Sequence, residues 1–345
     1  MKFKLLALCL AVLMLFSVTA CNTPAGNDPE TTDAGTTAGG GDVTSDPGES
    51  HYPVTITTYN YAGEEVTTTY EKAPEKVLCV YQGCIETMIA LGLEDHVIAS
   101  YGLDNPVKTE WEVALAKMNY NEEVFAPDLE TVTMMDPDMI FTWGSLFSDK
   151  KLGDVDTWIA QGTNTYISSN TRRGGHNRTL ENEYIDLINI GKIFNVEEKA
   201  QALVDEMKAE VTAALTAAAS QGTQNVLIVE YLGESISNYG ATSLCGNMVE
   251  ALGGTLASPD GSKFGKEDLV AMDPDVIFVV YMPKSCTEAE AIAQITSDPG
   301  LASLKAVQNG RVYAVMLGDT YASTVRSIDG IRALSAGLYP TLNAD

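Results

Sequence analysis

The sequence predicts an α/β protein made of two similar lobes, each with a central, mostly parallel sheet flanked by helices. One long helix joins the lobes, and a ligand cleft lies between them. Three observations support this prediction. Apolar runs of strand length alternate with helical patterns, a Met-Asp-Pro-Asp-x-Ile-Phe segment occurs at residues 135–141 and again at 272–278, and a long amphipathic helical pattern separates the two copies. Alternating strands and helices are typical of parallel sheets.

The length and the net charge of the chain limit the classes of protein to which it can belong. With 345 residues and 45% apolar content, the chain can bury a core in each of two domains. It carries 21 lysines and arginines against 47 aspartates and glutamates, a net charge of −26. Such a surface repels nucleic-acid phosphates and anionic lipid headgroups, so we expect no nucleic-acid partner.

The N-terminus predicts export and a lipid anchor. Lys2 and Lys4 precede an apolar stretch over residues 5–16, the pattern of a signal peptide over residues 1–20. The sequence then reads Val-Thr-Ala-Cys, which resembles a bacterial lipobox with Cys21 as the lipidated first residue of the mature chain. The alternative is an ordinary signal peptide followed by a chance cysteine.

Residues 21–52 read as the lipidated N-terminus and a disordered tether. They are polar, acidic and free of lysine and arginine. A segment of this composition cannot bury enough apolar surface to offset the entropy of ordering it. Anchor, tether and folded body together predict an extracytoplasmic protein held on the outer face of the cell membrane.

The strand patterns fall into an N-terminal lobe, residues 53–180, and a C-terminal lobe, residues 223–345, with a linking helical region at residues 181–222. The N-terminal lobe opens with a hairpin predicted at residues 54–59 and 65–70. Further strands are predicted at residues 76–81, 97–101, 139–143, 165–168, 225–231, 276–281 and 311–315.

The repeated segment has the same meaning in each lobe. Residues 130–135 and 267–272 read as short helices. These helices must end before Pro137 and Pro274, because the residue preceding a proline disfavours helical geometry. Unbroken apolar runs follow both prolines, as expected for buried parallel strands.

The linking helix is predicted from apolar residues spaced three and four apart between Val196 and Ala218. Asn195 is the expected N-cap and Gly222 the expected stop. At about 1.5 Å per residue, the helix spans on the order of 35 Å, the size of a lobe. We expect this stiff connection to allow only a small relative rotation of the lobes.

Four cysteines follow the predicted lipidation site. They show no C-x-x-C spacing, so the sequence gives no support for a structural zinc site. A disulfide among them is allowed but not required. The four are Cys79, which lies in an apolar run and is expected to be buried, Cys84, Cys245 and Cys286.

Several short motifs occur in order along residues 53–340. They are Pro-Glu-Lys-Val at 74–77, Glu-Thr-Met-Ile-Ala-Leu-Gly-Leu at 86–93, both Met-Asp-Pro-Asp-x-Ile-Phe segments, Ile-Gly-Lys-Ile-Phe at 190–194 and Gly-Arg-Val-Tyr at 310–313. In this order they resemble the substrate-binding lipoproteins of ABC importers that capture iron(III)-siderophores, haem or cobalamin, a family with a class III periplasmic-binding-protein-like fold. The resemblance implies a monomeric protein without a resident cofactor, whose partners are a metal chelate, an ABC permease and its ATPase.

Aromatic residues recur in the loops after the predicted strands. In open α/β sheets ligands bind beyond the carboxyl ends of the strands, so these loops name the candidate contacts. Flat side chains with one polar tip suit a large, partly apolar ligand such as a macrocycle or a catecholate. The candidates are Tyr81, Tyr101, Trp143, Phe147, Tyr231, Tyr239, Tyr281 and Tyr321.

One loop, residues 169–178, concentrates positive charge in this acidic chain. Guanidinium groups pair with carboxylate or catecholate oxygens in a bidentate manner. We therefore expect Arg172, Arg173 and Arg178 to hold an anionic chelate, with His176 as a contact or axial ligand. The alternative is a solvated surface loop. Arg326, at the start of the last helix, resembles a cleft-facing position of the family.

Two glutamates have a different expected role. Glu130 and Glu267 each stand seven residues before the proline of their repeat, one in each lobe. The resemblance implies that they dock onto arginines of the permease. The alternative is that they only favour the first turn of a helix, where acidic residues complement the helix dipole.

Rival functions have less support. The sequence lacks G-x-S-x-G, H-E-x-x-H, G-x-x-x-x-G-K-[ST] and G-x-G-x-x-G motifs, and its three histidines leave little general-base capacity, so we expect no enzyme. Few histidines also disfavour a receptor for a bare metal ion. A surface module without a ligand remains the third possibility. Among ligands, an iron chelate is favoured by the arginine loop, with a corrinoid close behind and haem still open.

Overall fold

The computed structural model describes residues 50–233, 235–261 and 263–343. The predicted signal peptide, the lipidation site Cys21 and most of the predicted tether lie outside these residues. The described chain is packed almost from its start. The Tyr52 hydroxyl donates to the carbonyl of Ile193 at 2.7 Å, and the ring of His51 hydrogen-bonds the carbonyl of Lys192. The last two residues of the predicted tether therefore contact the body.

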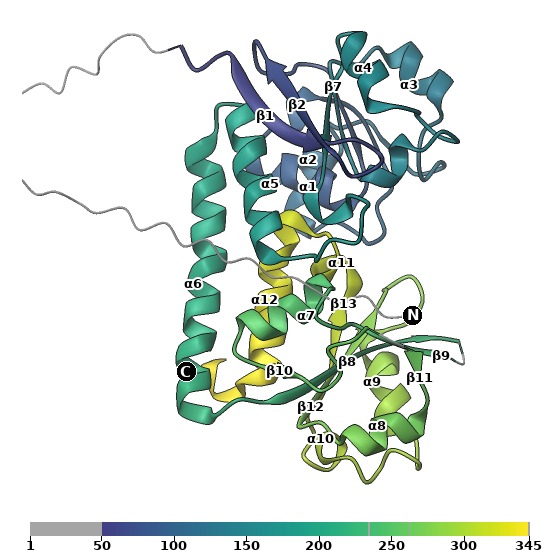
Figure 1. The fold of residues 1–345 in the computed structure, drawn as a ribbon, viewed down its shortest axis with the longest axis vertical. Helices are drawn as coiled ribbons and strands as arrows, with labels where there is room; N and C mark the ends of the chain where they lie inside the picture. The colour runs from purple at the N-terminus through teal and green to yellow at the C-terminus, as the bar shows by residue number, and fades with distance from the viewer. Residues whose placement is uncertain (1–49, 234, 262, 344–345) are drawn as a thin grey trace, which may run out of the picture. The chain divides into compact units, whose positions relative to one another are not determined.

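The N-terminal lobe, in the upper part of Figure 1, is built on a five-stranded sheet in which every pairing is parallel, with strand order β5-β4-β3-β6-β7. Its strands are β3 (Val77–Val80), β4 (Val97–Tyr101), β5 (Tyr120–Asn121), β6 (Met139–Thr142) and β7 (Asn164–Ile167). Its helices are α1 (Gln82–Leu91), α2 (Glu112–Leu115), α3 (Leu129–Met135) and α4 (Val155–Ala160). Helix α5 (Leu180–Ile193) packs into both lobes, with Leu180 and Leu187 in the core of the C-terminal lobe and Ile190 in that of the N-terminal lobe.

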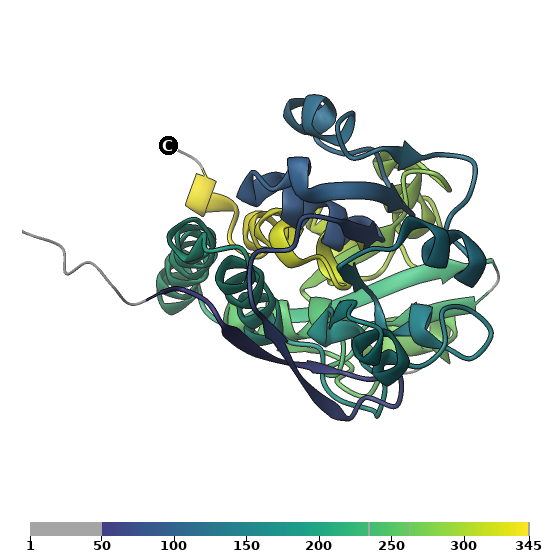
Figure 2. The ribbon, with the colours of Figure 1, turned by 90° about the horizontal axis from the view of Figure 1, so that it is seen from above.

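The leading hairpin confirms the prediction. Strands β1 (Val54–Tyr59) and β2 (Glu65–Tyr70) pair antiparallel and form a sheet of their own. Figure 2 shows this hairpin along one side of the molecule. It packs beside β7, and the backbone N–H of Ile167 donates to the Thr58 hydroxyl at 3.0 Å.

The C-terminal lobe has a mixed sheet of order β11-β9-β8-β12-β13, with β10 also paired to β8. Strands β8, β10, β12 and β13 run parallel, whereas β9 pairs antiparallel with β8, and β11 pairs antiparallel with β9 at the edge of the sheet. The strands are β8 (Asn225–Leu232), β9 (Ser235–Asn238), β10 (Thr255–Leu256), β11 (Lys263–Phe264), β12 (Val276–Tyr281) and β13 (Val312–Met316). The helices are α7 (Leu244–Ala251), α8 (Lys266–Met272), α9 (Glu288–Thr296), α10 (Lys305–Gln308), α11 (Leu317–Thr320) and α12 (Ser327–Leu338).

The repeated Asp-Pro-Asp segment has the same structural role in both lobes. Its first aspartate ends the helix in the left-handed region, with φ of 49° at Asp136 and 39° at Asp273. Its second aspartate fixes the start of the neighbouring strand. Asp138 accepts hydrogen bonds from the backbone of Glu75 and Lys76 before β3, and Asp275 accepts one from Asn225 at the start of β8. The two copies of the segment are therefore alike in local structure as well as in sequence.

The long linking helix is α6 (Glu197–Gln221), which ends at Gly222 as predicted. The predicted N-cap is wrong: Val196 occupies that position without a side-chain cap, and Asn195 has a left-handed φ of 55°. The reason is the short corner between α5 and α6, which leaves Asn195 in a reversing turn. A Cβ on Gly191 would lie 2.6 Å from Ala200, so the two helices meet closely there.

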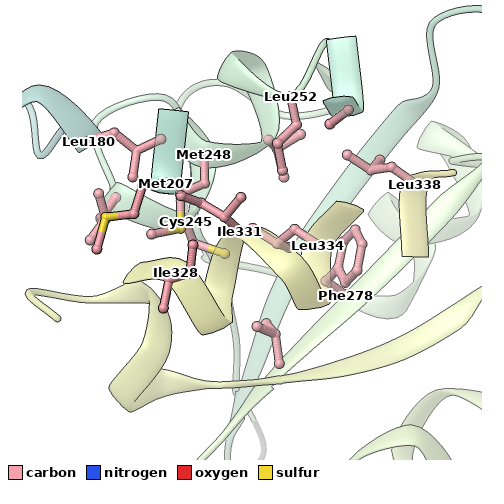
Figure 3. Close-up of a cluster of buried hydrophobic side chains, with 14 of the residues drawn as sticks. Leu180, Met207, Cys245, Met248, Leu252, Phe278, Ile328, Ile331, Leu334 and Leu338 are labelled. Atoms are coloured by element: carbon pink, nitrogen blue, oxygen red, sulfur yellow. The ribbon is translucent and has the colours of Figure 1, made fainter. Parts of the chain in front are cut away.

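Helix α6 belongs to both cores. Ala200 packs into the core of the N-terminal lobe, whereas Val204 and Met207 pack into that of the C-terminal lobe. Figure 3 shows Met207 among Leu180 and Cys245. The shared helix therefore ties the packing of one lobe to that of the other.

The four cysteines of the described chain are free thiols. Cys79, Cys84 and Cys245 are buried, and Cys79 is the small apolar core residue that the sequence predicts. Within residues 50–233, 235–261 and 263–343, none of the helices is both long and apolar enough to cross a bilayer.

Candidate ligand-binding cleft

A cavity of about 230 Å³ lies where the carboxyl ends of the parallel strands of both lobes meet, and we call it the cleft cavity. This is the edge at which open α/β sheets bind ligands. The N-terminal lobe contributes Gln82, Asp104, Asn105 and Trp143, which follow β3, β4 and β6. The C-terminal lobe contributes Met282, Leu317, Gly318, Tyr321 and Ala322, which follow β12 and β13.

Four aromatic rings form a row from one lobe to the other, the aromatic ladder. Tyr321 and Trp143, which both line the cavity, have ring centroids 5.7 Å apart. Tyr81 packs on Trp143 at 4.7 Å, and Phe125 on Tyr81 at 5.7 Å. These distances lie in the range favoured by offset and tilted aromatic pairs.

Tyr81 holds its place in the ladder through a strained backbone. Its φ of 79° is in the left-handed half of the map, which a tyrosine rarely adopts and which costs on the order of 1–3 kcal/mol. Its N–H donates to the carbonyl of Tyr101 at 2.8 Å, and its carbonyl accepts from Ile85 at the start of α1. The turn between β3 and α1 therefore fixes the ring behind Trp143.

The floor of the cavity is organised by Gln82. Its side-chain oxygen accepts hydrogen bonds from the backbone N–H groups of Asp104 and Asn105, both at 3.0 Å. Its side-chain nitrogen donates to Glu86 at 2.8 Å. The lobes approach closely here, because a Cβ on Gly318 would lie only 2.3 Å from the Asn105 amide nitrogen.

Arg326 lies beneath this floor, in what we call the interlobe ion cluster. Its guanidinium contacts Asp319 at 2.7 Å, Asp329 at 3.0 Å and Glu86 of the other lobe at 3.3 Å. Lys108 of the N-terminal lobe completes the cluster at 2.8 Å from Asp329. Burial raises the pKa of Glu86 to about 7 and that of Asp319 to about 6, although Arg326 opposes both shifts.

Comparison with known proteins identifies the family. The family model for periplasmic binding proteins matches residues 77–316, which run from the start of β3 to the end of β13. This chain belongs to the periplasmic binding protein family. The members of this family are solute-binding proteins of transport systems.

Several relatives of this periplasmic binding protein are known. A crystal structure of a periplasmic binding protein from Veillonella parvula matches with a TM-score of 0.81 and 31% identity, covering 88% of this chain and 97% of that one. Petrobactin-binding protein YclQ of Bacillus subtilis is 24% identical over 241 residues, 67% of this chain and 71% of YclQ. Ferric-anguibactin-binding protein FatB of Vibrio anguillarum is 26% identical over 224 residues, 61% of this chain and 65% of FatB.

The other aromatic candidates of this binding protein lie away from the cavity lining. Tyr101 and Phe147 belong to the core of the N-terminal lobe, with 6% and 1% of their surfaces exposed. Tyr231 and Tyr281 pack against a core cluster of the C-terminal lobe. The Tyr239 hydroxyl donates to Glu230 at 2.7 Å.

The arginines of residues 169–178 each stack on a tyrosine. Arg172 and Arg173 lie over the rings of Tyr59 and Tyr61 in the leading hairpin, at 4.7 and 4.5 Å. Arg178 lies 3.9 Å from the ring centre of Tyr321 and donates to its hydroxyl at 2.8 Å. Of the three, Arg178 is the one whose stacking partner lines the cavity.

His176 lies in the same loop and is partly buried. Burial lowers the pKa of His176, and the positive charge of Arg172 lowers it further.

Sequence reasoning missed one residue of the cavity lining, Gln82, and two buried acidic residues of α5 outside that lining. Gln82 directly follows the strand predicted at residues 76–81. The rule that ligands bind beyond the carboxyl ends of strands, which selected the aromatic candidates, therefore also applies to Gln82. Glu183 and Asp186 occupy buried positions of α5 beside Leu187 and Ile190. Burial raises the pKa of Glu183 to about 8 and that of Asp186 to about 6. The signal in the sequence was that Glu183 and Asp186 fall on the same helix face as the apolar residues of α5, which indicates burial of both acidic groups.

The paired glutamates are placed alike in the two lobes. Glu130 and Glu267 lie in the first turns of α3 and α8, and both are exposed. Exposed apolar side chains accompany them, Met134 on α3 and Val270 on α8. Each lobe of this binding protein therefore presents one carboxylate beside one apolar side chain.

Proposed function

We propose that this binding protein captures an iron(III)-siderophore-type chelate outside the cytoplasm and delivers it to an ABC importer. The observation that carries the proposal is the cleft cavity, which receives lining residues from both lobes at the carboxyl ends of their strands. Aromatic faces from both lobes suit a bulky, partly apolar ligand. Two curated relatives are named for binding petrobactin and ferric anguibactin, which supports the choice of an iron chelate.

A corrinoid or haem is the alternative ligand. Trp143 and Tyr321 offer flat surfaces that suit a macrocycle as well as an iron chelate. We further propose that the protein is a monomer, carries no catalytic activity and uses no cofactor of its own. Its proposed role is to bind the chelate and to release it to the importer.

Delivery requires a membrane partner. We propose that Glu130 and Glu267 dock onto basic residues of a permease that works with its ATPase, and that a lipid on Cys21 keeps the protein near that permease. The two glutamates are exposed and one lies in each lobe, which supports simultaneous contact of both lobes with one partner.

The identity of the ligand is tested directly by co-purification. The protein is purified from its full-length chain in detergent, and the bound small molecule is identified by mass spectrometry together with the visible spectrum. Melting temperatures are then measured with ferric chelates, cobalamin and haem, because a ligand that binds only the folded state stabilises it. We expect an iron-charge-transfer band and the largest stabilisation by a ferric chelate. A melting temperature unchanged by every ligand would contradict the proposal.

A further inference from the structure

Arg178 is paired with an aromatic hydroxyl instead of a carboxylate. Its guanidinium lies 3.9 Å from the ring centre of Tyr321, and one of its N–H groups donates to the Tyr321 hydroxyl at 2.8 Å. Arg326 and Arg332 pair with carboxylates, whereas Arg178 forms no ion pair within the described part of the chain. In a protein with 47 acidic residues, this arginine therefore keeps its full charge beside one tyrosine.

The backbones of both partners are fixed to the same lobe. The N–H of Arg178 donates to the carbonyl of Thr242 at 3.1 Å, which attaches the end of the arginine loop to the C-terminal lobe. The N–H of Tyr321 donates to the hydroxyl of Ser323 at 3.2 Å. Tyr321 therefore has a backbone anchor that does not depend on the guanidinium.

The Tyr321 hydroxyl is engaged only as an acceptor. A tyrosine hydroxyl has one proton to donate and lone pairs with which to accept. Arg178 donates to this oxygen, and among the hydrogen bonds of the described residues the Tyr321 hydroxyl is a donor in none. The nearby Tyr239 differs, because its proton is given to Glu230 at 2.7 Å. A hydroxyl that accepts from a cation also becomes a stronger donor, since hydrogen bonds in a chain polarise one another.

This pair lies at the cavity wall. Tyr321 is partly exposed and lines the cleft cavity, whereas Arg178 itself is not among the lining residues. A similar pair stands further along the aromatic ladder, where Lys151 donates to the Tyr81 hydroxyl at 3.3 Å. Tyr81, however, is only 3% exposed and lies behind Trp143. Of these two cation–tyrosine pairs, Arg178 and Tyr321 form the one that borders the cavity.

We infer that Arg178 is a positioning residue that acts on the ligand through Tyr321. By donating to the hydroxyl oxygen, it turns the O–H proton of Tyr321 towards the cavity, where that proton binds an acceptor oxygen of the ligand. The inference rests on the proposed function. The group recognised is a carbonyl or anionic oxygen, which iron chelates, corrinoids and haem all carry. The charge of Arg178 then reaches the ligand through one hydrogen bond and not through an ion pair.

A double-mutant cycle tests this relay. The full-length protein is titrated by calorimetry with ferrichrome, Fe(III)-enterobactin, cobalamin and haem, and the cycle uses the probe that binds most tightly. Tyr321→Phe removes the donor and should weaken binding by about tenfold. Arg178→Met should weaken binding by about fivefold in the natural chain but by less than about twofold in the Tyr321→Phe background, because its effect passes through the hydroxyl.

The alternatives give different cycles. An equal loss from Arg178→Met in both backgrounds would show that Arg178 contacts the ligand directly. That result, or a Tyr321→Phe variant with unchanged affinity, would overturn the inference and leave the proposed function standing. Absence of binding by all four probes would overturn both.

A rescue variant and a charge control complete the test. Arg178→Lys keeps a cationic donor and should bind at least about threefold more tightly than Arg178→Met, with no difference between them in the Tyr321→Phe background. The control is Lys208→Met, which removes an equal charge stacked 5.1 Å from the ring centre of Tyr184, outside the cavity lining. Equal losses from Lys208→Met and Arg178→Met would overturn the inference. Melting temperatures without ligand verify folding, and Arg178→Gln replaces Arg178→Met in the cycle if that variant is unfolded.

Discussion

The ring of Trp143, from the N-terminal lobe, lies 5.7 Å from the ring of Tyr321, from the C-terminal lobe. Trp143 also packs on the ring of Tyr81, and Tyr321 also stacks with the guanidinium of Arg178. The two lobes therefore present prearranged aromatic surfaces to the cavity between them, and a ligand bound there contacts both lobes at once.

Removing the indole should weaken ligand binding. Trp143→Ala deletes apolar contact area, and tryptophans buried at binding surfaces typically contribute about 2 kcal/mol, roughly thirtyfold in Kd. The control is Phe125→Ala at the outer end of the ladder, where 53% of the side chain is exposed. We expect the control to change Kd by less than about threefold in the same calorimetric titration. Equal losses in both variants would contradict a direct role for Trp143.

Removing Arg326 should strongly destabilise the body. Arg326→Met leaves Glu86, Asp319 and Asp329 without their shared partner, and breaking a buried ion pair costs about 3–5 kcal/mol. The matched control is Arg332→Met, because Arg332 is half exposed and pairs with surface glutamates of α6. Its loss should cost about 1 kcal/mol or less. Urea unfolding measures both changes, and similar losses would contradict the importance of the interlobe ion cluster.

The buried carboxyl groups predict how stability depends on pH. The folded state raises the pKa of Glu183 to about 8, of Glu86 to about 7 and of Asp186 to about 6, against roughly 4 for exposed acidic groups. Between these values the folded state binds more protons than the unfolded chain, so the free energy of unfolding falls as pH rises. If the three groups titrate independently, the free energy of unfolding falls by several kcal/mol, on the order of 5–8, from about pH 5 to about pH 8.

The measurement is urea unfolding at several pH values across that range. Glu183→Gln removes the group with the highest of these pKa values and should flatten the upper part of the profile. A stability that rises steadily towards about pH 8 would show that these carboxyl groups are not protonated in the folded state.

Reversing the paired glutamates should separate transport from binding. Glu130→Lys combined with Glu267→Lys should abolish uptake of the labelled chelate by cells, because like charges then face the permease, while the calorimetric Kd stays unchanged. The control is Glu65→Lys combined with Glu288→Lys, which makes the same charge change at two other exposed positions. Loss of uptake in both double variants would contradict docking through α3 and α8.

Much of the fold could be predicted because its signals are local. The hairpin strands, β4 and β12 have the predicted bounds, since apolar runs and turn residues define them without long-range information. The start of α6 was misplaced because the α5–α6 corner depends on the close packing of Gly191 against Ala200. That contact is set by the tertiary structure, and the capping preference of Asn195 gave no hint of it.

The site was only partly predictable. The rule that ligands lie beyond strand ends singled out Trp143 and Tyr321, which both line the cavity, and their contact with a ligand stays a prediction. It could not show that Arg326 is neutralised by three carboxyl groups, two of them on its own lobe and one across the interface. Nor could it show that Arg172 and Arg173 stack on the hairpin tyrosines, because those partners are more than 100 residues away in sequence. The binding of an anionic chelate by these arginines stays a prediction.

The most direct measurement of the central claim uses the tryptophan in the cavity. The chain has three tryptophans, and replacing Trp111 and Trp158 by phenylalanine leaves Trp143 as the only indole emitter. Ferric chelates absorb tryptophan emission, so binding between the lobes should quench it in a saturable titration with one chelate per protein. A chelate that raises the melting temperature of this variant without quenching Trp143 would contradict binding in the cleft.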